Sequence, residues 1–96
     1  MRSVAQWTVF EIGLRADRDY ADPFWDVDVE VHFRDASGRT KVVNAFWDGA
    51  RHWRVRFSPD ALGPWQWETS CSRTADVGLH GQRGEFACVP YEGDNP

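Results

Sequence analysis

Hydrophobic and polar residues alternate along most of this chain, which is the period of a β-strand with one buried face. The alternation is strict in residues 27–33. There Val27, Val29, Val31 and Phe33 share one side, while Asp, Glu and His residues occupy the other. This segment is therefore predicted to be a strand with one face in the core and one face in solvent.

Further segments repeat this period. Residues 53–57 and 65–71 alternate in the same way, residues 86–88 continue the pattern, and an earlier strand is predicted over about 7–14. Gly, Pro, Asp and Ser gather between these runs, and no segment shows a helical stripe. About six to eight short strands separated by turns predict an all-β fold, an immunoglobulin-like antiparallel β-sandwich. The predicted core comprises Trp7, Phe10, Val29, Val31, Phe33, Val42, Phe46, Trp53, Val55, Phe57, Trp67 and Phe86, and the parity of Trp25 assigns it to the core as well.

The segment 42–57 is predicted to form a hairpin with a two-residue loop at 49–50. This register places Phe46 opposite Trp53, so that both side chains face the core, whereas a three-residue loop would place Phe46 opposite an arginine. The outer face of the hairpin is then predicted to carry Trp47, Arg54 and Arg56, with Asp48 at its end.

Length and charge restrict the function further. Ninety-six residues make one small domain, and a net charge of −4 without a basic stripe argues against a nucleic-acid partner. No apolar run is long enough for a transmembrane helix, and residues 1–6 lack the features of a signal peptide, so no membrane partner and a cytoplasmic location are expected. Cys71 and Cys88 are expected to be reduced, half-buried thiols; the alternative, a disulfide between them, would add about 3 kcal/mol of stability.

Short aromatic motifs in series indicate a family. They are QWTVFE at 6–11, DPFWDV at 22–27, AFWDG at 45–49, WRVRFSP at 53–59, LGPWQWET at 62–69 and GQRGEF at 81–86. Their order and spacing resemble the immunoglobulin-like N-terminal domain, a domain of unknown function, of apiosidase-like glycoside hydrolases. Two positions depart mildly from that pattern: Asp22 stands where Asn is usual, and Trp47 where Tyr is common.

The resemblance implies that a (β/α)₈ catalytic barrel follows the sandwich. Residues 1–90 are then the accessory domain, and residues 91–96 are the start of the linker to the barrel. On this interpretation the domain is not an enzyme itself and packs on the barrel of the same polypeptide or borders its cleft. The alternative function is a carbohydrate-binding module that uses an exposed Trp as a platform.

Four residues are the candidate carbohydrate or domain-interface site. Trp47 can stack on a sugar ring beside Arg54, or it can dock on the barrel. Asp48 and Arg56 can pair and fix the turn, or Arg56 can meet a carboxylate of the barrel.

Other chemistry has weaker support in the sequence. A glycosidase needs two carboxyl groups in a cleft, and a sandwich of this size has little room for one, so no catalytic residue is predicted. The acidic loop of Asp17, Asp19, Asp22 and Asp26 is interpreted as a hydrophilic turn, with calcium binding as the alternative. The histidines have no metal-ligand spacing, and no cofactor is expected.

Overall fold

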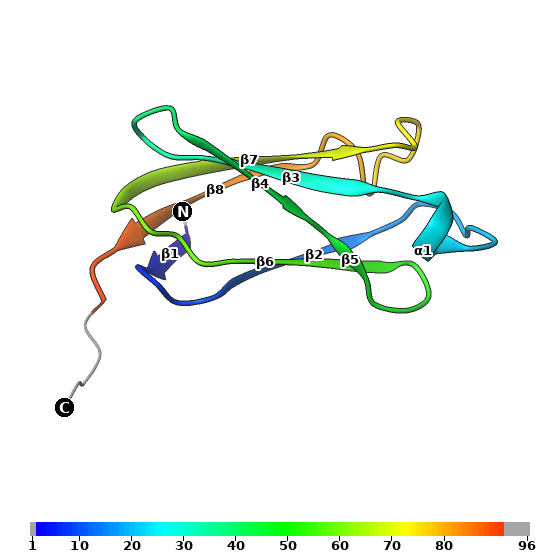
Figure 1. Ribbon diagram of the computed structural model, residues 1–96, viewed down its shortest axis with the longest axis horizontal. Helices are drawn as coiled ribbons and strands as arrows, with labels where there is room; N and C mark the ends of the chain where they lie inside the picture. Colours follow the sequence, from blue (N-terminus) through cyan, green and yellow to red (C-terminus); the bar gives the residue numbers. More distant parts are fainter. Residues whose placement is uncertain (1, 92–96) are drawn as a thin grey trace.

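The computed structural model describes residues 2–91, apart from the side chains of Pro23 and Phe24, and forms two facing β-sheets (Figure 1). The larger sheet has the order β1-β8-β7-β3-β4, and the smaller has the order β2-β6-β5. The larger sheet comprises β1 (Arg2–Ala5), β8 (Arg83–Val89), β7 (Gly63–Cys71), β3 (Val29–Arg34) and β4 (Thr40–Asn44). The smaller comprises β2 (Phe10–Arg15), β6 (His52–Phe57) and β5 (Phe46–Trp47), and one short helix, α1 (Pro23–Asp26), precedes β3. The predicted β-sandwich is confirmed, with one parallel pair, β1 and β8, among antiparallel neighbours.

The core lies between the sheets and is rich in aromatic rings. Phe33 of the larger sheet stacks on Phe57 of the smaller at 4.0 Å between ring centroids, and Trp65 meets Phe57 edge-on at 5.1 Å. Phe86 continues this row to Phe10 across the sandwich at 4.5 Å. The indole N–H of the fully buried Trp65 donates to the Ala61 carbonyl, so its polar atom is satisfied.

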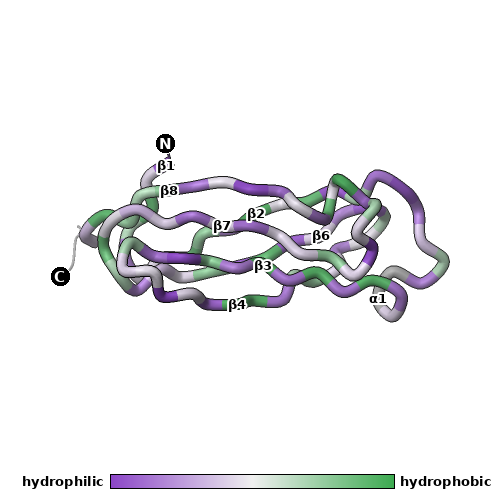
Figure 2. The backbone as a smooth tube through the Cα atoms, turned by 90° about the horizontal axis from the view of Figure 1, so that it is seen from above, coloured by the Kyte–Doolittle hydropathy of each residue, from purple (hydrophilic) through white to green (hydrophobic). Residues whose placement is uncertain are grey.

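Most of the predicted core is confirmed. Figure 2 shows the alternation of hydrophobic and hydrophilic residues along the strands that produces it. The buried members of the predicted set are Phe10, Val29, Val31, Phe33, Trp53, Val55, Phe57 and Phe86, and Trp67 is half-buried against them. Four assignments are wrong, because Trp7, Trp25, Val42 and Phe46 are exposed.

The predicted hairpin over 42–57 is also wrong, and the reason is a change of sheet. β4 pairs with β3 in the larger sheet, and after Ala45 the chain crosses to the smaller sheet, where β5 pairs with β6. The turn has three residues, 49–51, and Phe46 lies opposite Arg54. Trp47 therefore lies opposite Trp53 and faces inward, instead of lying on the outer face.

The two cysteines lie far apart. Cys88 is opposite Gly63 at one end of β7, and Cys71 is at the other end, eight residues or about 26 Å away along the strand. A disulfide requires Cα atoms within about 7 Å. Both thiols are free and buried, and burial raises the pKa of each. The expected reduced thiols agree with this geometry.

The two ends of the sandwich differ. β1 and the end of β8 lie at one end of the long axis, and α1 lies at the other, beside β5 (Figures 1 and 2). Among residues 2–91 no helix has the length and apolar character needed to cross a membrane. Of the predicted linker at 91–96, only Tyr91 is among the described residues.

Candidate functional site

The outer face of the smaller sheet carries a ladder of ion pairs. Arg54 donates from Nε to Asp48 Oδ2 at 2.5 Å and from Nη1 to Glu11 Oε1 at 2.6 Å. Arg56 donates from Nε to the other oxygen of Glu11 at 2.8 Å, and its guanidinium lies over the ring of Phe46 at 5.4 Å. Asp48 therefore pairs with Arg54, and the predicted pairing with Arg56 is wrong. The strand register explains the change, because Glu11 lies directly opposite Arg56.

The charged side chains of the ladder pair with one another. Hydrogen bonds from Arg56 and Arg54 hold the pKa of the Glu11 carboxyl below its usual range, and Glu11 and Asp48 raise the pKa of Arg54. Such exposed pairs add little stability but fix the direction of each side chain. Arg56 is 61% exposed and bonds through Nε to Glu11, so its outer nitrogens point toward solvent as donors.

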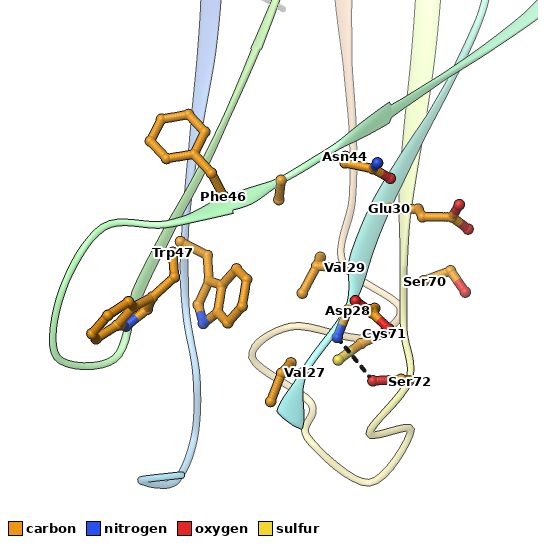
Figure 3. A pocket seen from close by; sticks show the side chains of 12 residues that line it. Val27, Asp28, Val29, Glu30, Asn44, Phe46, Trp47, Ser70, Cys71 and Ser72 are labelled. Atoms are coloured by element: carbon orange, nitrogen blue, oxygen red, sulfur yellow. Dashed lines mark hydrogen bonds between the residues drawn. The ribbon is translucent and has the colours of Figure 1, made fainter. Parts of the chain in front are cut away.

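Trp47 lies in a groove at the open edge of the sandwich (Figure 3). Its side chain is 37% exposed, and its indole N–H donates to the Ala50 carbonyl at 2.9 Å. The turn that accepts this bond is tight, with Ala50 at a φ of 49° and Gly49 at 94°. The structure thus brings Asp48, Arg54 and Arg56 together on one face and places Trp47 on the opposite side of the same strand pair.

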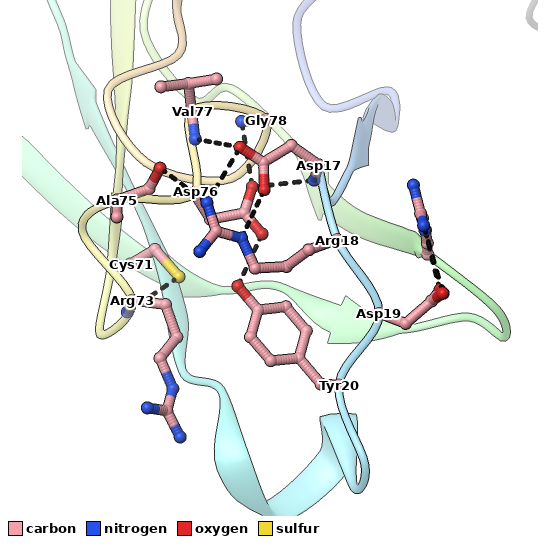
Figure 4. A network of polar contacts seen from close by, with 11 residues as sticks. Asp17, Arg18, Asp19, Tyr20, Cys71, Arg73, Ala75, Asp76, Val77 and Gly78 are labelled. Atoms are coloured by element: carbon pink, nitrogen blue, oxygen red, sulfur yellow. Dashed lines mark hydrogen bonds and ion pairs between the residues drawn. The ribbon is translucent and has the colours of Figure 1, made fainter.

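A buried carboxylate ties two loops together at the α1 end (Figure 4). Asp76 is fully buried and accepts bonds from Tyr20 Oη at 2.6 Å, from the Asp17 N–H at 3.0 Å and from the Gly78 N–H at 3.1 Å. Burial, followed by the bond to Asp76, raises the pKa of Tyr20 to about 12. Sequence analysis did not identify Asp76, because an Asp in a polar loop has no pattern that distinguishes a buried residue from a solvated one.

The acidic loop beside this carboxylate is tied up by arginines and backbone groups. Asp17 accepts from Arg18 at 2.7 Å, Asp19 accepts from Arg51 at 2.8 Å, and Asp26 accepts from the Asp22 N–H at 3.2 Å. Within the described residues no group of three or more acidic, His or Cys side chains is arranged to hold a metal ion.

An apolar patch covers the end of the sandwich where β8 finishes. We call it the end patch: the exposed side chains of Trp7, Val9, Leu62 and Tyr91. Trp7 is 65% exposed and has a φ of 69°, which is rare for a bulky residue. Two hydrogen bonds hold Trp7 there. The Trp7 N–H donates to the Pro59 carbonyl, and Ser58 Oγ donates to the Trp7 carbonyl.

A crystal structure described as “a putative glycoside hydrolase from Bacteroides vulgatus ATCC 8482” matches 99% of this chain with a TM-score of 0.81 and 28% identity. The chain spans 17% of the length of that protein. Among curated proteins none matches.

A known protein family also matches this chain. The family described as Domain of unknown function (DUF5060) matches residues 3–72, which is more than half of the chain and includes the motifs from QWTVFE to LGPWQWET. This confirms the family-level resemblance seen in the sequence. The chain therefore belongs to the DUF5060 family, a domain of unknown function.

Proposed function

We propose that this chain is a non-catalytic accessory domain of a glycoside hydrolase and that it packs on a (β/α)₈ catalytic barrel of the same polypeptide. The observation that carries the proposal is the comparison of lengths: nearly all of this chain matches a sixth of a much larger protein described as a glycoside hydrolase. A match of that kind is expected of one domain in a multidomain enzyme.

The acidic residues support a non-catalytic role. A glycosidase keeps one carboxyl group protonated by an apolar environment while a second stays ionised. Glu11 and Asp48 are held in ion pairs with arginines, and Asp28, just before β3, and Glu30, on β3, are exposed. None of these four has the sheltered environment of a general acid.

The end patch supports packing on a second domain. Aromatic residues are more frequent in protein interfaces than on the rest of a protein surface. Trp7 is exposed and is held outward at a strained backbone angle. The patch includes Tyr91, from which the chain continues. Arg56 lies on β6 two residues before Ser58, which bonds to the Trp7 carbonyl. Arg56, a residue of the predicted interface, therefore lies close to the end patch. Its outward nitrogens suit a carboxylate of the barrel.

The test uses a polypeptide in which this domain is joined to the catalytic barrel. We expect Trp7→Ser with Leu62→Ser to lower the unfolding temperature of the joined protein and to change that of the 96-residue chain much less, because both side chains are exposed in the chain alone. Val77→Ser is the matched control, since Val77 is an exposed apolar residue in the loop network at the other end, where its N–H donates to Asp17 (Figure 4). Calorimetry that shows two domains unfolding independently, with no effect of the double substitution, would reject the packing.

A second candidate function is carbohydrate binding through Trp47. The observation that favours it is the groove in which Trp47 lies, because the groove combines an exposed indole with polar side chains. An accessory domain can carry both functions, since the groove and the end patch are on different parts of the sandwich.

A further inference from the structure

The groove exists because one strand changes sheets. β4 runs beside β3 as far as Asn44, and the Ala45 N–H still donates to the Val29 carbonyl at 2.9 Å. Beyond this point the chain crosses to the smaller sheet as β5, so residues 27 and 28, which precede β3, have no β4 residue beside them. An open groove of about 730 Å³ remains between β5 and the segment 27–30.

One wall of the groove is aromatic and fixed in orientation. Trp47 and Trp53 are directly opposite each other on β5 and β6, so their side chains leave the same face of the strand pair, and both line the groove. Trp53 is buried, whereas Trp47 is partly exposed. The bond from the Trp47 indole to the Ala50 carbonyl fixes the ring before any ligand arrives. A ligand that stacks on Trp47 therefore costs little side-chain entropy.

The rim of the groove is polar and available. Asp28, Glu30, Asn44 and Ser70 line it, and all four are exposed. Within residues 2–91, the interaction of these four side chains with another residue is a long ion pair of 3.9 Å between Glu30 and His32. Carboxylates accept hydroxyl protons, and an amide both donates and accepts. An aromatic face beside such groups matches a saccharide ring, which has an apolar C–H face and hydroxyls at its edge.

The charge of the rim selects among saccharides. Asp28 and Glu30 are negative, and none of the residues that line the groove is Lys, Arg or His. Arg73 lies outside the lining, and its Nε donates to the Asp26 carbonyl at the end of α1 at 3.1 Å. A uronic acid would bring a third negative charge to this rim, and the two carboxylates would repel it.

We propose that this groove binds neutral glycans, with one sugar ring stacked on Trp47 and hydroxyls further along the glycan bonded to Asp28 and Asn44, and that it discriminates against uronic-acid glycans. The inference rests on the second candidate function and names its ligand class. It does not depend on docking of the end patch, because the two surfaces are separate.

The experiment uses the 96-residue chain, which has a complete core of its own. The chain is titrated with cellohexaose, xylohexaose, mannohexaose and arabinohexaose, and with hexagalacturonate, by calorimetry and Trp fluorescence. We expect saturable binding of at least one neutral oligosaccharide and none of hexagalacturonate. Trp47→Ala should weaken binding about tenfold or more, as loss of a central aromatic contact does. Trp7→Ala, which removes an exposed indole elsewhere, should leave the affinity unchanged.

A folding defect is separated from a binding defect by a surface variant. Asp28 is exposed, so Asp28→Asn should keep the unfolding temperature while it weakens binding of the neutral glycan and lets hexagalacturonate bind. Binding that survives both Trp47→Ala and Asp28→Asn would place the site elsewhere. Equal affinity for hexagalacturonate, or no response to any neutral oligosaccharide, would overturn the proposal. Neither result affects the docking test, which is measured on the joined polypeptide.

Discussion

Tyr20→Phe tests whether the buried carboxylate of Asp76 holds the two loops together. The substitution removes one hydroxyl, and with it the 2.6 Å bond from Tyr20 to Asp76. Two backbone N–H groups, those of Asp17 and Gly78, continue to bond the carboxylate. A hydrogen bond to a charged group is worth about 1.5–3 kcal/mol, so we expect a loss of about 2 kcal/mol. In a domain of this size that lowers the unfolding temperature by about 8–16 °C.

The pH dependence of this loss identifies the bond. The pKa of Tyr20 is raised to about 12 in the folded chain, while an unfolded Tyr titrates near 10. The unfolded state therefore loses its proton first, and this contribution is complete below pH 10 and is lost as the pH rises toward 12. A shift of two pKa units corresponds to an upper limit of about 2.7 kcal/mol.

The assay is urea unfolding followed by circular dichroism, for the natural chain and Tyr20→Phe, from about pH 8 to about pH 12. Subtracting the two free energies of unfolding cancels every other titration that the two chains share. The difference should be about 2 kcal/mol at the lower pH and should disappear at the higher. A difference that stays constant across this range would refute the assigned role of the phenol. A difference below about 0.5 kcal/mol at pH 8 would show that the bond adds no stability.

Two further predictions concern packing and the thiols. A Cβ at Gly78 would lie 1.9 Å from the Arg15 carbonyl oxygen, so Gly78→Ala should cost about 3 kcal/mol or more, whereas Gly13→Ala meets nothing within 4 Å and should stay within about 0.5 kcal/mol in the same urea assay. Cys71 and Cys88 are too far apart to bond, so a reductant should leave the unfolding temperature unchanged and both thiols should react with a thiol reagent once the chain is unfolded. A melting temperature that falls in reductant would contradict this arrangement.

The fold could be predicted where one strand face is buried along its whole length. Residues 29–33 and 53–57 alternate strictly, and their apolar members are all buried. In such strands each side chain either enters the core or meets water, so the sequence records the face directly. Trp65, in the alternating segment 65–71, follows the same rule and is fully buried, although the predicted core does not include it.

The predicted core is wrong for two aromatic residues outside these strands. Trp25 was assigned to the core by the parity that it shares with Val27, and Trp7 as the first residue of the strand predicted over about 7–14. Trp7 is instead turned outward by a positive φ, and Trp25 is exposed on α1. Neither the turn nor the helix has a periodic pattern, so parity taken from the neighbouring strands does not extend to them. The contacts of Asp76 are equally non-local, since Tyr20 is 56 residues away.

The largest error in the predicted site and the groove have the same origin. Alternation fixes which residues share a face, but it does not say which strand is the neighbour. Residues 42–47 were therefore paired with β6 throughout, although the first part pairs with β3 and only Phe46 and Trp47 reach β6. The crossing at Ala45 that invalidates the predicted register is also what leaves residues 27 and 28 without a β4 neighbour and turns Trp47 inward toward the open edge. A site that depends on two sheets diverging cannot be inferred from any one strand, because the residues that line it belong to five strands, β3 to β7.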